Sequence, residues 1–309
     1  MHPSQIEAAL EAGYAAGKAA SGGKNADYIP YLASVPSDLF GLVITTAGGQ
    51  TWARGDVDHA FAIESISKVF SLALALETHG IDQVRTKIGA SATGMPFNSV
   101  MALELHDGRP LSPLVNAGAI ATTSLAPGAT AEEQWSSILA MQSAFAGHAI
   151  ALGDEAYASE QATNFHNRAI AWLLYDRGYC YCDPMQAVDV YTRQCSTLVT
   201  CRDLAAMGAT LAAGGIHPET GKRVIAREHV SPILAEMMME GLYEASGEWA
   251  FNVGLPGKSG VGGGLLAIAP GKLAIAAFAP PLDEAGNSVA GQAAIAAVAR
   301  QLGLSVFAA

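Results

Sequence analysis

The chain has 309 residues, of which 50% are hydrophobic and 15% are charged, and its formal net charge is −11. This length supports one large domain or two packed subdomains with a sizeable core. The excess of acidic residues, with no basic stripe, argues against a nucleic-acid binder, which has to neutralise phosphates, and against binding to anionic membranes.

The first twenty residues carry Glu7 and Glu11 among alanines, which predicts an amphipathic helix rather than a basic segment followed by the apolar core of a signal peptide. No apolar run approaches the roughly 18 residues of a membrane span. We therefore expect a cytoplasmic protein. The spacings of the four cysteines, at positions 180, 182, 195 and 201, match no zinc site, so reduced and partly buried thiols are expected.

The N-terminal third predicts a β-hairpin and then a helix. Residues 39–46 are rich in apolar and β-branched side chains, residues 47–50 form a turn, and a return strand starts at Thr51. A helix is predicted from Ser65 to His79, with a glycine directly after it as the C-cap. Between residues 83 and 128, glycines and prolines predict irregular structure.

Helices dominate the middle of the chain and strands return near its end. Five helices are predicted, at residues 130–145, 155–176, 183–194, 200–213 and 229–243. Short strands are predicted at residues 250–253, 263–269 and 273–278, and a helix at residues 287–302 closes the chain.

This order predicts an α+β fold in which one antiparallel sheet, flanked by helices, is built from both ends of the chain. We expect residues 1–65 and 216–309 to form the sheet subdomain and residues 66–215 to form an inserted all-helical subdomain. The active site is expected between the two.

The segment from Phe61 to Phe70 carries the first sign of chemistry, because Ser65 stands three residues before Lys68 at the start of a helix. Residues with this spacing lie on one face of a helix, so the lysine amine can reach the serine hydroxyl. A serine nucleophile needs such a base, and a lysine can act as one when burial or a nearby positive charge lowers its pKa. The helix N-terminus also offers N–H groups to a developing oxyanion.

A second segment, Lys258-Ser259-Gly260, leads into Val261 and three glycines. In serine acyl transferases a Lys-Ser/Thr-Gly strand lies opposite the nucleophile helix, and the residue after the motif can donate its N–H to the oxyanion. The glycines let the backbone approach a ligand closely. The alternative is a strand and turn with an exposed lysine.

Polar residues elsewhere suit an amino-acid substrate. Asn116 can bind a carboxylate or an amide. Glu160 and Asn167 lie seven residues apart in one predicted helix, so both are expected on one face, where a carboxylate beside an amide suits an ammonium group. The alternatives are a turn asparagine and a solvated helix face. Tyr191 and Tyr243 are expected to close two helices.

Together these motifs resemble the serine-dependent glutaminases, a β-lactamase-like family with bacterial and mitochondrial members. The matching segments run in family order from about residue 25 to about residue 290. They are Asp27-Tyr28-Ile29-Pro30, Ser65-Ile66-Ser67-Lys68, Phe97-Asn98, Asn116-Ala117-Gly118-Ala119-Ile120, Gln194-Cys195-Ser196, Gly241-Leu242-Tyr243, Gly254-Leu255-Pro256-Gly257-Lys258-Ser259-Gly260-Val261 and Pro281-Leu282-Asp283.

The resemblance implies a serine β-lactamase/DD-peptidase-like fold and hydrolysis of L-glutamine to L-glutamate and ammonia through a glutamyl-serine ester. It implies Ser65 as nucleophile, Lys68 as base, Tyr243 as a proton carrier and Tyr28 nearby in the pocket. The N–H groups of Ser65 and Val261 would form the oxyanion hole. Asn116 and Tyr191 would bind the α-carboxylate end of the substrate. Glu160 and Asn167 would bind its α-ammonium.

The chain departs from the family at Glu64, where a glutamine is common, and a carboxylate facing inward there would raise the pKa of Lys68. No cofactor or metal is expected. A homo-oligomer, dimer or tetramer, is expected from the resemblance alone. Two alternatives are a β-lactamase or cell-wall peptidase, which act outside the cytoplasm, and a non-catalytic amino-acid sensor, which has no need of a nucleophile and a base.

Overall fold

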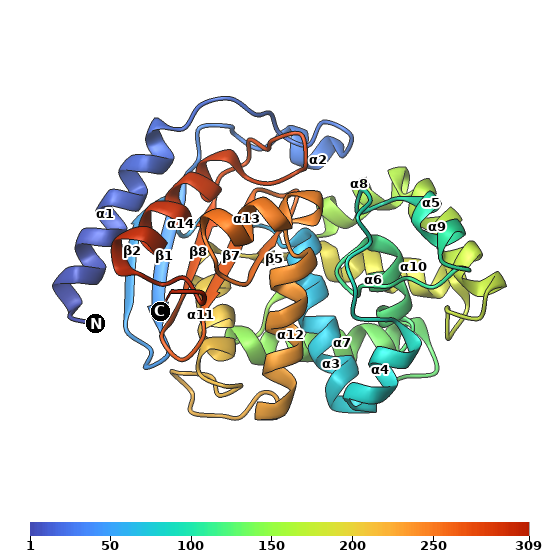
Figure 1. Cartoon of the computed structure of the whole chain (residues 1–309). Helices are drawn as coiled ribbons and strands as arrows, with labels where there is room; N and C mark the ends of the chain where they lie inside the picture. The colour runs from blue at the N-terminus through green and yellow to red at the C-terminus, as the bar shows by residue number, and fades with distance from the viewer. Residues whose placement is uncertain (309) are drawn as a thin grey trace.

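A five-stranded antiparallel sheet forms one end of the molecule and helices form the other (Figure 1). The computed structural model describes residues 1–308. The strand order in the sheet is β2-β1-β8-β7-β6. The bounds of these strands are Gly41–Thr46 for β1, Thr51–Gly55 for β2, Gly257–Ser259 for β6, Gly264–Ala269 for β7 and Leu273–Phe278 for β8. Strand β1 therefore joins the two ends of the chain by pairing with β2 on one side and β8 on the other.

Alternating side chains of these strands fill two separate cores. Leu42 and Ile44 of β1 pack with helices α1 (Pro3–Ala19) and α14 (Val289–Leu302), which lie side by side. Val43 points to the opposite face, which is covered by α11 (Cys201–Ala212). Because both faces are covered, β7 and β8 are buried along their whole length and appear in the sequence as continuous apolar runs.

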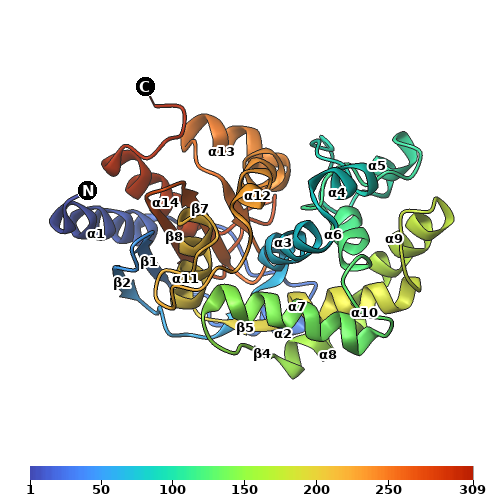
Figure 2. The ribbon, with the colours of Figure 1, turned by 90° about the horizontal axis from the view of Figure 1, so that it is seen from below.

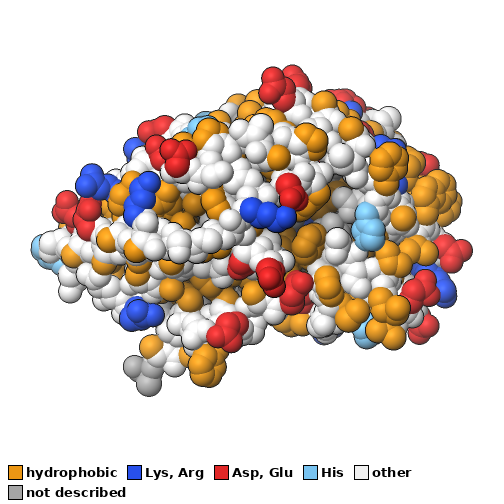
Figure 3. Space-filling model, turned by 90° about the horizontal axis from the view of Figure 1, so that it is seen from above, with side chains coloured by type: hydrophobic (Ala, Val, Ile, Leu, Met, Phe, Trp, Pro, Cys, Tyr) orange, Lys and Arg blue, Asp and Glu red, His pale blue; other side chains and the backbone are white. Residues whose placement is uncertain are grey.

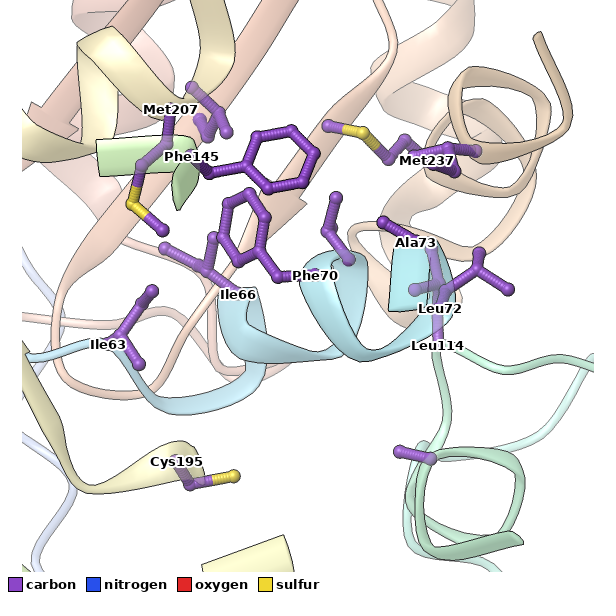
Figure 4. Close-up of a cluster of buried hydrophobic side chains, with 14 of the residues drawn as sticks. Ile63, Ile66, Phe70, Leu72, Ala73, Leu114, Phe145, Cys195, Met207 and Met237 are labelled. Atoms are coloured by element: carbon purple, nitrogen blue, oxygen red, sulfur yellow. The ribbon is translucent and has the colours of Figure 1, made fainter. Parts of the chain in front are cut away.

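The helical end is arranged around α3 (Ser67–His79), which lies between α12 (Arg227–Glu240) and α6 (Asn116–Thr123) (Figure 2). In Figure 4, Phe70 points from α3 toward Phe145, whereas Cys195 lies on the other side of the helix. The remaining helices are α2 (Pro30–Ala33), α4 (Ile81–Lys87), α5 (Val100–Leu105), α7 (Ala131–Ala146), α8 (Asp154–Thr163), α9 (Phe165–Asp176), α10 (Pro184–Cys195) and α13 (Ser246–Asn252).

A small second sheet connects the two ends of the molecule. Its strands are β3 (Phe61–Ala62), β5 (Thr197–Val199) and β4 (Ala151–Leu152), in that order. Strand β3 leads directly into the turn before α3. The boundary expected at residue 215 stays a prediction, and α11, which lies inside the range 66–215, packs on the large sheet.

Most predicted elements are present. The hairpin has the expected turn, with Thr45 opposite Thr51. Helix α3 ends at His79 and is followed by Gly80, whose φ of 80° suits a glycine C-cap. The hydroxyl of Thr130 accepts from Glu133 N in a capping box, as expected for the start of a helix there.

Three predictions were wrong. Residues 83–128 are irregular only in part, because α5, α6 and most of α4 lie in this range, and α6 is stabilised by burial of all its residues. Residues 250–252 belong to α13 and Val253 is its C-cap, and both Trp249 and Val253 pack onto the sheet. The helix predicted at 155–176 is two helices that meet at Asn164, whose side chain donates to Thr192.

Among residues 1–308, no helix is long and apolar enough to cross a membrane. Acidic and basic side chains are scattered over the face in Figure 3 rather than gathered in one patch.

Candidate active site

Ser65 lies where the sheet end meets the helical end, in the 3₁₀ turn Glu64–Ile66 that leads into α3. It is 7% exposed. The N–H groups of Ser65 and Val261 donate no hydrogen bond within residues 1–308. Val261 directly follows the Lys-Ser-Gly motif, which forms β6 and the residue after it. Ser65 and Val261 both line one cavity, and their two backbone donors have no partner among the described residues.

Lys68 lies in the first turn of α3 and is 1% exposed. Its Nζ donates to Asn116 Oδ1 at 2.7 Å. Burial lowers the pKa of Lys68 to about 8, and this effect outweighs the charges of Cys195 and Glu64, which act in the opposite direction. A buried amine with this pKa is neutral often enough near neutral pH to accept a proton.

Tyr243 is buried, and its backbone has a φ of 56°, in the left-handed region that a residue with a side chain seldom adopts. It does not close a helix, as the sequence predicted, but lies in a 3₁₀ turn after α12. Burial raises the pKa of its hydroxyl, and the nearby Ser65 side chain counteracts this. The hydroxyl has no well-aligned hydrogen-bond partner among the described residues, so it is free to bond a substrate or an intermediate.

Lys258 of the Lys-Ser-Gly motif is fully buried, not exposed. Its Nζ donates to the carbonyl oxygens of Gly241 and Ser259, at 2.9 and 2.8 Å, and lies 4.0 Å from the centre of the Tyr243 ring. Burial, followed by the charge of Lys68, lowers the pKa of Lys258 well below its usual value. This lysine therefore ties β6 to the turn that carries Tyr243.

A cavity of about 250 Å³ opens above Ser65. It is lined by seven of the residues predicted from the sequence, Tyr28, Ser65, Asn116, Glu160, Asn167, Tyr191 and Val261. Lys68 and Tyr243 are buried around it. A larger groove of about 950 Å³, beside α11 and α12, contains none of the predicted residues.

Asn116 connects its own helix, α6, to three other helices at one side of this cavity. Its Oδ1 accepts from Lys68 and, at 3.2 Å, from the hydroxyl of Tyr191, which lies inside α10 rather than at its end. Its Nδ2 donates to Asn167 Oδ1 at 3.0 Å. These bonds fix the orientation of the amide, because the lysine can only donate to an oxygen.

Glu160 and Asn167 both line the cavity, as expected, but the elements that carry them differ from the prediction. They stand on two helices, α8 and α9, rather than on one face of a single helix. Glu160 is 8% exposed and accepts from the Ser196 hydroxyl at 3.0 Å. Burial raises its pKa to about 7.

Tyr28 precedes Pro30 and reaches the cavity from the long N-terminal segment. More than half of the residue is exposed, at 57%, so it lies at the mouth of the cavity rather than in its floor. Burial of its hydroxyl, followed by the charges of Glu64 and Glu160, raises its pKa.

Glu64, which the sequence marked as a departure from the family, faces inward and lines the cavity. Sequence reasoning missed two other parts of this site: Ser196 supports Glu160, and Cys195 lines the cavity from α10. A signal for both was present, because Cys195 and Ser196 belong to one of the motifs quoted above. Among residues 1–308, no group of three or more histidine, cysteine or acidic side chains could hold a metal ion.

The model of the Glutaminase family matches residues 23–307 of this chain. The chain belongs to the glutaminase family. It is 68% identical over 302 residues to a glutaminase of Brucella canis, which covers 98% of this chain and 95% of that protein. It is 61% identical over 303 residues to glutaminase 1 of Escherichia coli O157:H7, with 98% of each chain covered.

Solved structures agree with this assignment. A probable glutaminase, ybaS, superposes with a TM-score of 0.98 at 59% identity over the whole of both chains. A Bacillus glutaminase superposes with a TM-score of 0.86 at 32% identity, covering 91% of this chain and 96% of that one. The reaction of this glutaminase is the hydrolysis of L-glutamine to L-glutamate and ammonia.

Proposed function

We propose that this glutaminase works through a covalent glutamyl ester on Ser65, with neutral Lys68 as the base. The observation that carries the proposal is the buried Nζ of Lys68, one helical turn from Ser65 and fixed by Asn116. Asn116 offers the amine an uncharged acceptor, so the hydrogen bond orients Lys68 without holding it in the charged form as a carboxylate would.

The reaction follows from this placement. Lys68 takes the proton of the Ser65 hydroxyl while Oγ attacks the side-chain amide carbon of glutamine, and the N–H groups of Ser65 and Val261 stabilise the oxyanion. Collapse breaks the C–N bond. Lys68 returns the proton to the leaving ammonia through the Tyr243 hydroxyl, and water then hydrolyses the ester to glutamate.

Recognition of glutamine requires an acceptor for its α-ammonium and donors for its α-carboxylate. Glu160 and Asn167 supply the first, on the side of the cavity formed by α8 and α9. The amide of Asn116 and the hydroxyl of Tyr191 supply the second. Tyr28, at the mouth of the cavity, lies near the bound substrate.

The shared arrangement of a Ser-x-x-Lys helix facing a Lys-Ser-Gly strand supports a β-lactamase-like ancestry. The subdomain division and the cytoplasmic location stay expectations from the sequence. A different observation supports a homo-oligomer. Several large apolar side chains are exposed on α5 and α9, over the helical end where hydrophobic atoms gather in Figure 3. They are Met101, Leu105, Phe165, Trp172 and Tyr175.

One experiment tests the proposed chemistry directly. The purified protein is exposed to a diazo-ketone analogue of glutamine, and intact mass with peptide mapping locates the adduct. A single adduct on Ser65 is expected, together with ammonia release from L-glutamine that is far faster than from L-asparagine or D-glutamine. An adduct on a cysteine, with Ser65→Ala still active, would contradict the acyl-serine mechanism.

A further inference from the structure

Two buried carboxyl groups meet in the cavity. Glu64 comes from the turn before α3 and is 4% exposed, and Glu160 comes from α8. Both side chains line the same cavity, and each influences the pKa of the other. Two ionised carboxylates repel each other strongly at low dielectric, so a pair of buried carboxyl groups in one cavity is stabilised when one of them holds a proton.

The surroundings favour a proton on Glu64 rather than on Glu160. Glu160 Oε1 also accepts from the Ser196 hydroxyl, which favours its charged form. Glu64 Oε1 is buried and accepts no hydrogen bond from a donor group within residues 1–308. Burial raises the pKa of both carboxyl groups. For Glu64 the charge of Glu160 adds to the effect of burial, so the pKa of Glu64 lies well above its usual value.

The position of Glu64 is built into the fold. Its φ of 52° places the backbone in the left-handed region, which costs about 1 kcal/mol or more for a residue with a side chain. Two glycines after β6 lie against it: a Cβ at Gly260 would be 3.2 Å from Glu64 Cβ, and a Cβ at Gly262 would be 3.2 Å from Glu64 Cγ. The turn after the Lys-Ser-Gly motif therefore holds this carboxyl group against Glu160.

We propose that Glu64 is a positioning residue that acts in its protonated form: it donates a hydrogen bond to the Glu160 carboxylate, so that the pair presents a single negative charge to the single positive charge of the substrate. The inference rests on the proposed site, in which Glu160 binds the α-ammonium.

This protonation state also matters for Lys68. An ionised Glu64 would raise the pKa of the lysine and keep it charged, whereas a neutral Glu64 leaves it available as a base. The other titratable groups around the pair come from several elements, and they are Tyr28, Lys68, His166, Tyr191, Cys195 and Tyr243.

Two variants of nearly equal size separate the possibilities. Glu64→Gln keeps a neutral donor to Glu160, and Glu64→Met keeps the length of the side chain but removes the donor. The kinetic constants of both are measured against pH, and the readout is the position of the pH limbs rather than the rate. With Glu64 protonated in the wild type, the acid limb of kcat in Glu64→Gln stays where it is in the wild type.

Glu64→Met is expected to behave differently. Loss of the donor raises the pKa of Glu160, so the KM for glutamine rises as pH falls, and by about tenfold or more relative to Glu64→Gln. An infrared difference spectrum of wild type minus Glu64→Gln near neutral pH provides a readout independent of turnover, and the carbonyl stretch of a protonated carboxyl group is expected in it.

Two results would overturn the inference. The first is an acid limb in Glu64→Gln that moves by about one to three units toward acid, since that is the shift expected when a paired carboxylate is removed from a lysine. The second is an identical dependence of KM on pH in the two variants. Failure of the proposed mechanism has a separate signature, because Ser65→Ala would then remain active.

Discussion

The Nζ atom of Lys68 and the Oδ1 atom of Asn116 are 2.7 Å apart, and both residues are buried. Lys68 stands on α3 and Asn116 on α6, so the base for the reaction is held by a helix other than its own. The acceptor is an uncharged amide oxygen. Replacing it by a carboxylate of the same shape therefore tests how the site controls the charge of Lys68.

Asn116→Asp is expected to raise the pKa of Lys68, because an anion in contact with the amine stabilises its charged form. The acid limb of kcat/KM should move by about one to three pH units toward alkaline pH. Tyr191→Phe removes the other hydrogen bond to the same oxygen without adding charge. The acid limb of kcat/KM in this variant should therefore stay at the wild-type pH. If the acid limb lies at the same pH in the wild type, Asn116→Asp and Tyr191→Phe, Lys68 is not the titrating group.

The pH dependence of the wild type follows from Lys68. Its pKa is lowered to about 8, and only the neutral amine accepts a proton, so kcat/KM should rise with pH through that value and fall below it. Lys68→Ala should lower kcat by roughly a hundredfold or more and should lose this limb. A wild-type rate that is flat from acid to alkaline pH would argue against Lys68 as the base.

Glu160→Gln tests substrate recognition, because it keeps the shape of the side chain and removes its charge. Loss of a charge-assisted hydrogen bond costs about 1.5–3 kcal/mol, which is one to two decades in kcat/KM for L-glutamine. An analogue that lacks the α-amino group should be affected far less. The measurement is the ratio of kcat/KM for the two substrates, and a ratio equal to that of the wild type would place the ammonium site elsewhere.

Gly241→Ala tests the contact between β6 and the turn that carries Tyr243. A Cβ at this position would lie 1.7 Å from the carbonyl oxygen of Gly257, so the backbone has to move and the free energy of unfolding should fall by about 2–4 kcal/mol.

Gly247→Ala is the matched control for this prediction. Gly247 lies in α13, and a Cβ there meets nothing within 4 Å. Since alanine favours a helix over glycine, this variant should be more stable by about 0.5–1 kcal/mol. Denaturant unfolding of both variants provides the comparison, and equal changes in stability would contradict the packing argument.

Local sequence determined much of the chemistry and part of the fold. The spacing from Ser65 to Lys68 needs only one helical turn, so it could be predicted without any tertiary information. The hairpin of β1 and β2 and the capped start of α7 at Thr130 likewise depend on neighbours within a few residues.

Only the tertiary structure decided the features that depend on distant contacts. The helical pattern of residues 155–176 continues through Asn164, but a hydrogen bond to Thr192 of α10 accompanies the break that sets Glu160 and Asn167 on separate helices. The inward direction of Glu64 depends on two glycines almost two hundred residues away, which no local pattern could indicate. Burial, and with it the pKa values of Lys68 and the two carboxyl groups, arises when the two ends of the chain pack against the helices between them.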